Sequence, residues 1–215
     1  MIPLHAWTTP NGRKISIMLE EIGMAYVVET VDIGAGEQLA PDYLRISPNH
    51  KIPAIVDDLA GLVEGGRLAT FESGAILTCL AGQSGQLLAP LEPACYRALE
   101  WLDWSIGGLG PMLGQLMFFA IRSEAKAPLA ILRFTPEADR LLGVLETRLV
   151  DAPFLGGDVH SIADIAADPW ALTATTSLGD VLANSLASKP SLHRWLNVVG
   201  SRLAVARGMN IPPGS

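Results

Sequence analysis

The hydrophobic pattern changes once along this chain, and the change divides it into two parts that fold differently. Before residue 83, short β-branched and apolar runs alternate with stretches of helical spacing. After residue 93, the long apolar stretches have helical spacing and no run is typical of a strand. Residues 83–93, rich in glycine and proline, are typical of a linker. We therefore expect an α/β domain at residues 1–82, a linker at 83–93 and an all-α domain at 94–215.

The first part predicts the element order β-α-β-α-β-β-α. The elements are expected at Pro3–Trp7, Asn11–Ile22, Tyr26–Val31, Pro41–Ile46, Ala54–Asp57, Leu68–Phe71 and Ser73–Ala81. Three glycines within residues 58–67 indicate a loop between the last two strands. In the second part, helices are expected at Ala94–Phe119, Glu137–Val150, Ile162–Thr176 and Leu192–Val205.

Charge and cysteine content disfavour several classes of function. The 215 residues include 15 Lys and Arg against 22 Asp and Glu, and the resulting net charge of −7 repels phosphate backbones, so no nucleic acid partner is expected. Cys79 and Cys95 lack zinc or disulfide-framework spacing, and the four histidines lack metal-ligand spacing, so we expect no metal and two core cysteines. The start of the chain has no secretory pattern, so we expect a cytoplasmic protein. The longest uncharged run, Trp104–Ile121, contains a proline and four glycines, which favours a buried helix over a membrane span.

Two helix starts carry polar residues that suit a charged ligand. Thr9 and Asn11 begin the first helix, where they either cap it or direct a hydroxyl and an amide at a ligand thiolate. Glu72 and Ser73 precede an apolar helix. Ser73 either caps this helix or binds a carboxylate, in which case Glu72 would hold an ammonium group. The second interpretation fits the two charged groups of an amino acid.

Pro53 follows Ile52 directly before a strand. A cis peptide at proline costs only about 0.5–1 kcal/mol. It would leave the backbone N–H and C=O of Ile52 free to pair with an extended, peptide-like ligand. A trans turn is the alternative, and the sequence does not choose between them.

Two further patterns occur in the second part. Ser161 and Asp164 have the spacing of a capping box and are interpreted as structural. Four small residues share one helical face, where either a second helix or a ligand could approach closely. These residues are Gly107, Gly110, Pro111 and Gly114.

With these residues placed, the chain resembles the cytosolic glutathione transferases over nearly its whole length. It is more narrowly similar to their nu class and the disulfide-bond reductases related to it. The motifs that carry the resemblance are TPNG at 9–12, GEQ at 36–38, ISPNHKIPAIVD at 46–57, FESGAIL at 71–77, GGLGPMLGQ at 107–115 and SIADIA at 161–166. The resemblance implies a thioredoxin-like first domain, an all-helical second domain, a homodimer, and one or two glutathione molecules per subunit.

The resemblance also implies roles for individual residues. Ile52, before a cis Pro53, would pair with the cysteinyl part of glutathione, and Glu72 with Ser73 would hold its γ-glutamyl end. Asn11, with Thr9 nearby, would face the sulfur. Gln38 and Lys51 would reach the glycine end or a second glutathione, and Arg133 would contact a second glutathione. Thr135-Pro136 departs from the pattern, because a helix that starts there would leave Arg133 outside it.

The leading hypothesis is a glutathione-dependent disulfide-bond reductase with lesser transferase or peroxidase activity, acting on small-molecule thiols and disulfides. No tyrosine precedes Tyr26, which disfavours a tyrosine-assisted transferase. No cysteine precedes Cys79, so the reacting sulfur would come from glutathione. One alternative is conjugation of glutathione to small electrophiles, received by an apolar wall of Met112, Leu116 and Phe119. Another is a non-catalytic glutathione-binding scaffold.

Overall fold

The first domain is built on a four-stranded mixed sheet. The structure is a computed structural model that describes residues 1–58 and 66–213. The strands are β1 (Ile2–Ala6), β2 (Tyr26–Thr30), β3 (Ala54–Asp58) and β4 (Arg67–Phe71), in the order β2-β1-β3-β4. β1 pairs in parallel with β2, while β3 pairs antiparallel with both β1 and β4. Most of the loop expected at 58–67 lies outside the described residues.

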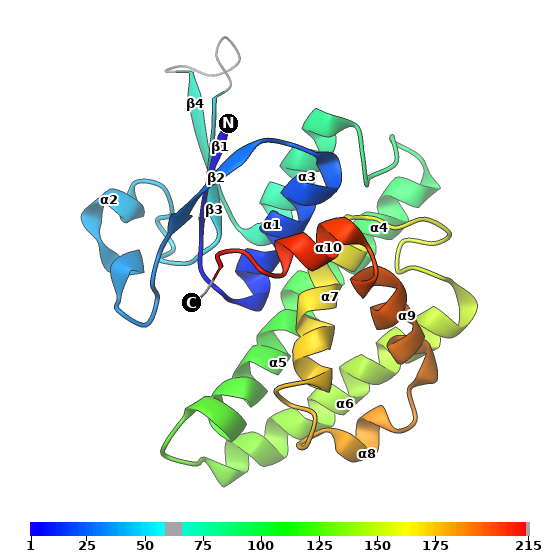
Figure 1. The fold of residues 1–215 in the computed structure, drawn as a ribbon. Coiled ribbons are helices and arrows are strands. Elements are labelled where there is room, and N and C mark those ends of the chain that lie inside the picture. Colours follow the sequence, from blue (N-terminus) through cyan, green and yellow to red (C-terminus); the bar gives the residue numbers. More distant parts are fainter. Residues whose placement is uncertain (59–65, 214–215) are drawn as a thin grey trace. The chain divides into compact units, whose positions relative to one another are not determined.

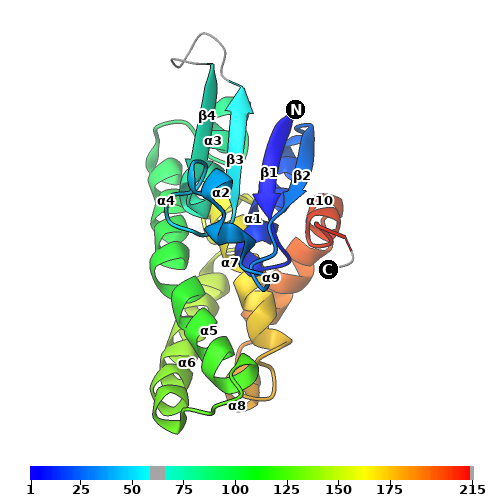
Figure 2. The same ribbon diagram turned by 90° about the vertical axis from the view of Figure 1, so that its left-hand side faces the viewer.

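Helices cover both faces of this sheet (Figures 1 and 2). Two of them, α1 (Pro10–Ile22) and α3 (Ser73–Ser84), lie on one face, and the short α2 (Pro41–Leu44) lies on the other, after a 3-10 turn at Glu37–Leu39. Ile2, Leu4 and Ala6 alternate along β1 with half-buried residues and are themselves buried. Gly23 ends α1 in the left-handed conformation, with φ of 65°. The element order predicted from the sequence is confirmed.

The C-terminal segment packs with the first domain, which differs from the expected boundaries. The compact units are Met1–Gln86 with Arg202–Ser215, and Leu87–Ser201. Helix α10 (Leu203–Gly208) lies along α1, where the hydroxyl of Ser16 donates to the carbonyl of Gly208 at 2.7 Å. The expected helix at 192–205 is therefore two helices, α9 (Pro190–Gly200) and α10, which belong to different units. The expected linker is also shorter, because α3 extends to Ser84 and α4 starts at Pro93.

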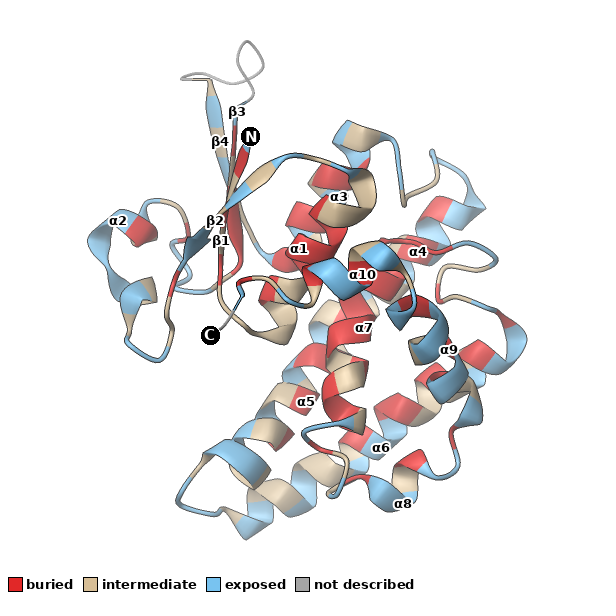
Figure 3. Ribbon diagram, in the orientation of Figure 1, coloured by how far each residue is buried: buried red, intermediate tan, exposed pale blue. Residues whose placement is uncertain are grey.

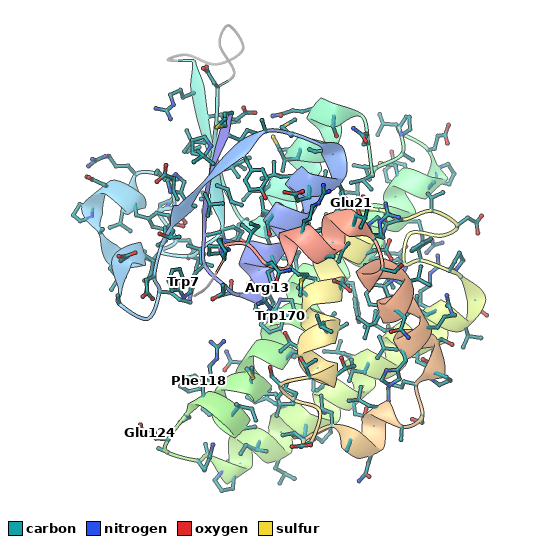
Figure 4. All side chains as sticks on the ribbon, in the orientation of Figure 1. Trp7, Arg13, Glu21, Phe118, Glu124 and Trp170 are labelled. Atoms are coloured by element: carbon teal, nitrogen blue, oxygen red, sulfur yellow. The ribbon has the colours of Figure 1, made fainter. Side chains whose placement is uncertain are left out.

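The second domain is helical throughout, as expected. Its elements are α4 (Pro93–Trp104), α5 (Gly110–Met117), α6 (Pro128–Asp151), α7 (Ile162–Thr175), α8 (Ala183–Leu186) and α9, with π-helical segments at Ser105–Leu109 and Phe118–Arg122. Most of α7 is buried (Figure 3). Trp170 of α7 lies against the small residues of α5 (Figure 4), because a Cβ at Gly110 would be 2.9 Å from its Nε1 atom and one at Gly114 would be 3.2 Å from its ring. At these two positions, close helix packing accounts for the small residues.

The capping box at the start of α7 is a structural centre of this domain. The hydroxyl of Ser161 accepts from Ala163, and the Asp164 carboxylate accepts from the N–H of Ser161 at 3.0 Å. The same carboxylate accepts from the N–H of Leu155 at 2.9 Å and from the indole of Trp195 at 2.8 Å. The structural interpretation of Ser161 and Asp164 is therefore confirmed.

Helix α6 continues through Pro136, so Arg133 lies inside a helix. Proline removes one backbone hydrogen bond and usually bends or ends a helix. Here α6 is packed on both sides of the proline. Phe134 stacks on Phe119 before it, at 6.0 Å between ring centroids, and Leu141 and Leu142 are buried after it. This tertiary packing offsets the lost hydrogen bond, and the expected helix start at Thr135-Pro136 is wrong.

One helical run of the described chain is long and apolar enough to cross a membrane. It spans Pro93–Arg122 and comprises α4, α5 and both π-helical segments, and 28% of its most apolar window is buried. The expectation of a mainly buried helix is therefore too simple. Much of this surface is half-buried or exposed, and Phe118 is 51% exposed.

Candidate functional site

A cavity of about 120 Å³ lies in the first domain, where α1, the segment before β3 and the start of α3 meet. Its lining residues are Asn11, Ser47, Lys51, Ile52, Pro53, Phe71, Glu72 and Ser73. Six of these lining residues were predicted from the sequence as site residues, although they are spread over some 60 positions: Asn11, Lys51, Ile52, Pro53, Glu72 and Ser73. Ser47 and Phe71 were not predicted. Their positions in ISPNHKIPA and FESGAIL, beside the predicted residues, were the available signal.

The start of α3 presents unsatisfied donors to this cavity. Glu72 is the N-cap residue and Ser73 the first helical residue, and neither side chain caps the helix. Within the described residues, the N–H groups of Ser73, Gly74 and Ala75 have no acceptor, and Ile76 is the first to donate, to the carbonyl of Glu72. Capping by Ser73 was one of the two open interpretations, and it is wrong. A helix start of this kind is suited to a carboxylate.

Glu72 adds a negative charge beside these donors. Its φ of 69° and ψ of 115° lie outside the regions that residues with a Cβ normally occupy, at a cost of order 1–3 kcal/mol. The side chain of Asn49 donates to its carboxylate at 3.2 Å. The backbone thus holds an exposed carboxylate at the end of β4, which suits a positively charged ligand group. The N–H donors beside it suit a negatively charged one.

Lys14 of α1 is a buried charge near the same carboxylate. Only 1% of its surface is exposed. Burial lowers its pKa to about 7, and the charge of Glu72 opposes this shift only in part. The sequence-based prediction did not include Lys14, because the residues around it give no sign of its burial.

The start of α1 offers fewer backbone donors than expected. Thr9 is its N-cap, and its hydroxyl accepts from the N–H of Gly12 at 3.1 Å while its carbonyl accepts from Arg13 at 3.0 Å. Pro10 has no N–H. The capping interpretation of Thr9 is therefore confirmed, and Thr9 does not line the cavity. Asn11 does, and it supplies a side-chain amide there.

The segment before β3 leaves a backbone donor open. The Ile52–Pro53 peptide is cis, which decides between the two isomers that the sequence allowed. The N–H of Ile52 has no acceptor within the described residues. The carbonyl of Lys51, in the same peptide unit, accepts from Tyr43 and Ser47. An extended ligand could pair with the free N–H.

The other predicted site residues lie outside this cavity. Gln38 is in the 3-10 turn, and its amide oxygen is buried without a partner in the described structure. Arg133, Met112, Leu116 and Phe119 belong to the second compact unit. Arg133 is exposed on α6, whereas Met112 and Phe119 are half-buried.

Leu116 is an error in the predicted apolar wall. It is fully buried, with 0% of its surface exposed, so it cannot offer a face to a small electrophile. The helical face that carries it packs inside the second domain, where α5 contacts α6 and α7. Phe118 is exposed in this region, and it makes an edge-to-face contact with Phe119 at 5.1 Å between ring centroids.

Neither cysteine lines the cavity. Cys95 is buried in α4, and Cys79 is on α3, where the side chain of Gln83 donates to its sulfur at 3.4 Å. Burial and the nearby Asp57 carboxylate raise the pKa of the Cys79 thiol. A raised pKa reduces the thiolate population, which is the reactive form. No group of three or more His, Cys, Asp or Glu residues among those described could hold a metal ion.

Comparison with known proteins identifies the family. Residues 8–83 match the glutathione S-transferase N-terminal domain, and residues 111–202 match the C-terminal domain. This chain belongs to the glutathione S-transferase family. The disulfide-bond oxidoreductase YfcG of Escherichia coli is 44% identical over 97% of the chain and 94% of its own length. YghU of the same organism, also named a disulfide-bond oxidoreductase, is 36% identical over 96% of the chain and 73% of its own length.

Solved glutathione transferases have the same fold. A family member from Pseudomonas fluorescens, with two glutathione molecules bound, matches with a TM-score of 0.91 and 42% identity over 98% of this chain and 93% of its own. A glutathione transferase from Pseudomonas putida, with one glutathione disulfide per subunit, matches with a TM-score of 0.91 and 39% identity over 98% and 91%. The expected glutathione transferase fold, an α/β domain followed by a helical one, is confirmed.

Proposed function

We propose that this protein is an enzyme, a disulfide-bond reductase that uses the thiols of one or two bound glutathione molecules. The observation that carries this proposal is the helix start at Glu72 and Ser73. Three open N–H groups there suit the α-carboxylate of the γ-glutamyl group, and the Glu72 carboxylate suits its ammonium. The names of the two Escherichia coli relatives and the ligands of the Pseudomonas structures support it.

The remaining lining residues suit the rest of the tripeptide. The free N–H of Ile52 would donate to the cysteinyl carbonyl, and Lys51 would attract the glycine carboxylate. Asn11 would donate its amide to the sulfur and stabilise the thiolate. Gln38 would contact the glycine end or a second glutathione, and Arg133 a second glutathione. Met112 and Phe119, with Phe118 in place of Leu116, would form an apolar surface for the substrate.

The chemistry needs no protein thiol. The thiolate of one glutathione attacks a substrate disulfide, so that one S–S bond breaks, a mixed disulfide forms and the released thiolate takes up a proton. A second glutathione thiolate attacks the mixed disulfide and releases the second substrate thiol and glutathione disulfide. One disulfide is reduced and two glutathione molecules are oxidised. The raised pKa of Cys79 and the burial of Cys95 are consistent with their absence from these steps.

Two statements about the whole protein belong to the same proposal. We infer a homodimer, since the second domain exposes large apolar residues that a monomer would leave in water, including Tyr96, Leu129 and Leu132. Sedimentation at micromolar concentration tests this, and a monomer would contradict it.

We also infer a cytoplasmic enzyme without nucleic acid or membrane partners, in which Pro93–Arg122 is a domain helix, not a membrane span.

Reduction of 2-hydroxyethyl disulfide by glutathione tests the proposed activity. The wild-type protein should turn over this substrate, and the Cys79→Ala/Cys95→Ala double variant should retain most of the rate because glutathione supplies both thiols. Ser73→Ala should raise the KM for glutathione. Glutathione binding without turnover would instead indicate a scaffold, and conjugation of 1-chloro-2,4-dinitrobenzene without disulfide reduction would indicate a conventional transferase. Loss of turnover in a folded double cysteine variant would contradict the mechanism.

A further inference from the structure

Two hydroxyl groups converge on one backbone carbonyl at the edge of the cavity. The phenol of Tyr43 donates to the carbonyl of Lys51 at 2.7 Å, and the hydroxyl of Ser47 donates to the same oxygen at 2.8 Å. Tyr43 is 6% exposed and Ser47 is 0% exposed. Lys51 itself is exposed, so its carbonyl is held from the protein side by two buried donors. Two donors on one carbonyl oxygen restrict the rotation of the whole peptide unit.

That peptide unit also carries the open N–H of Ile52. The Lys51–Ile52 peptide is trans, so its C=O and N–H are fixed in one plane and point in opposite directions. Anchoring the oxygen therefore fixes the direction of the N–H, which has no acceptor within the described residues. Ile52 and Ser47 both line the cavity.

We propose that Tyr43 and Ser47 are positioning residues that hold the Lys51–Ile52 peptide unit so that the Ile52 N–H is preorganised for its ligand. This inference rests on the proposed function, since the ligand is the cysteinyl carbonyl of glutathione. Neither hydroxyl has to touch the tripeptide for this role. The benefit comes from ordering the donor before binding, because a loop that must be ordered during binding reduces affinity.

The surroundings of Tyr43 suit a fixed donor. The backbone carbonyl of Tyr43 accepts from the N–H groups of Ile46 and Ser47, both at 2.9 Å, which closes the turn after α2. His5 of β1 packs edge-to-face on its ring, at 6.0 Å between centroids. Burial raises the pKa of Tyr43 to about 12, so its hydroxyl keeps its proton at neutral pH. The donor is thus connected to α2 and to the sheet.

Tyr43→Phe tests the inference, with Tyr26→Phe as the matched control. Tyr26 is in the same domain, and its phenol donates to Glu20 at 2.8 Å, away from the cavity. Since one neutral hydrogen bond is removed, Tyr43→Phe should raise the Kd and KM for glutathione about three- to tenfold. The kcat at saturating glutathione should stay within about twofold, because the bound geometry is the same once the ligand holds the loop. Tyr26→Phe should change neither constant.

The double variant gives a sharper result. Since the remaining hydroxyl still holds the oxygen in part in each single variant, Tyr43→Phe/Ser47→Ala should weaken binding by more than the product of the two single effects. Wild-type affinity in Tyr43→Phe, or an equal loss in Tyr26→Phe, would overturn the inference. The single variant decides the question if the double variant does not fold.

The inference can also be checked without a ligand. In ¹⁵N relaxation measurements of the free protein, the Ile52 amide should be more mobile in Tyr43→Phe than in wild type. If wild-type protein fails to bind glutathione, the proposed function is contradicted. An Ile52 amide with unchanged mobility would separately overturn the positioning role.

Discussion

At the scale of single residues, Asn11 is the polar side chain best placed to influence the chemistry. Thr9 uses its hydroxyl and carbonyl to cap α1, and Pro10 has no N–H, so little of the backbone at this helix start is left to stabilise a thiolate. Asn11 lines the cavity and has a side-chain donor. The two residues of the sequence motif TPNG therefore differ in place: Thr9 caps the helix and Asn11 lines the cavity.

Asn11→Ala should slow disulfide reduction by about tenfold to a hundredfold, because a preorganised donor to a developing charge is removed. The pH profile of the rate at saturating glutathione should move to higher pH, since the thiolate loses stabilisation. Thr9→Ala serves as the comparison and should reduce stability by about 1 kcal/mol, as expected for loss of an N-cap. An unchanged rate and profile in Asn11→Ala, with both lost in Thr9→Ala, would assign the sulfur contact to the threonine.

The lowered pKa of the buried Lys14 should make the free energy of unfolding depend on pH. Its pKa of about 7 in the folded protein is well below the value of about 10.4 in an unfolded chain. Between these values the unfolded chain binds more protons, so this residue makes stability rise with pH from about 7 to about 10. Below pH 7 both states are charged, and the full cost of burying the ammonium applies. That cost is of order 5 kcal/mol at most.

Lys14→Met removes this cost while preserving the apolar chain. We expect the free energy of unfolding to increase by about 2 kcal/mol at pH 6, part of the full penalty, with a smaller increase at pH 9.5. Urea unfolding at both pH values measures it. The exposed Lys126, whose ammonium bonds the carbonyl of Ala120, provides the control as Lys126→Met and should show little change at either pH. A destabilised Lys14→Met protein at pH 6 would show that the ammonium is a net stabilising group.

At the scale of elements, helix packing depends on which glycines face a neighbour. Gly110 lies against the indole of Trp170, whereas a Cβ at Gly143 in α6 would meet nothing within 4 Å. Alanine has the higher helix propensity, so the same substitution is expected to have opposite signs at the two positions.

Gly110→Ala should lower the free energy of unfolding by about 1–2 kcal/mol through overpacking. Gly143→Ala should raise it by about 0.5–1 kcal/mol through propensity alone. Chemical denaturation of both variants makes the comparison. If Gly110→Ala were as stabilising as Gly143→Ala, Trp170 could not be packed as tightly on α5 as the structure indicates.

At the scale of the whole molecule, the chain returns to its first domain after completing the second. Arg202 bonds the carboxylate of Glu21, with 2.8 Å between Nη2 and Oε2, and Figure 4 shows Glu21 beside α10. Gly208 lies so close to α1 that a Cβ there would be 2.5 Å from the backbone nitrogen and Cα of Ile17. Because the obstacle is backbone, it cannot move aside as a flexible side chain would.

Gly208→Ala should therefore destabilise the first domain by about 2–3 kcal/mol or release the C-terminal segment. Hydrogen exchange should accelerate in α1, and proteases should cleave after residue 200 more readily. Gly200→Ala is the control, since a Cβ at that residue meets nothing within 4 Å. Equal protection of α1 in the two variants would contradict a stabilising role for the C-terminal segment.

The sequence determined the elements and much of the candidate site. Period-two and helical patterns are local properties, so the strands and helices of the first domain lie within a few residues of their predicted ends. The site residues Ile52, Glu72 and Ser73 could be chosen because their motifs have distinctive local chemistry. Ser47 could have been included on the same grounds, as it stands four residues before Lys51.

Other features depended on contacts between residues far apart in the sequence, which local patterns do not encode. The packing of Phe134 on Phe119 carries α6 through Pro136, and the approach of Gly208 to Ile17 assigns the C-terminal helix to the first domain. The burial of Lys14 and of Leu116 is likewise set by neighbours far away in sequence. A local pattern fixes what a segment can form, whereas the free energy of packing determines which face is buried, which donor is left open and which helix continues.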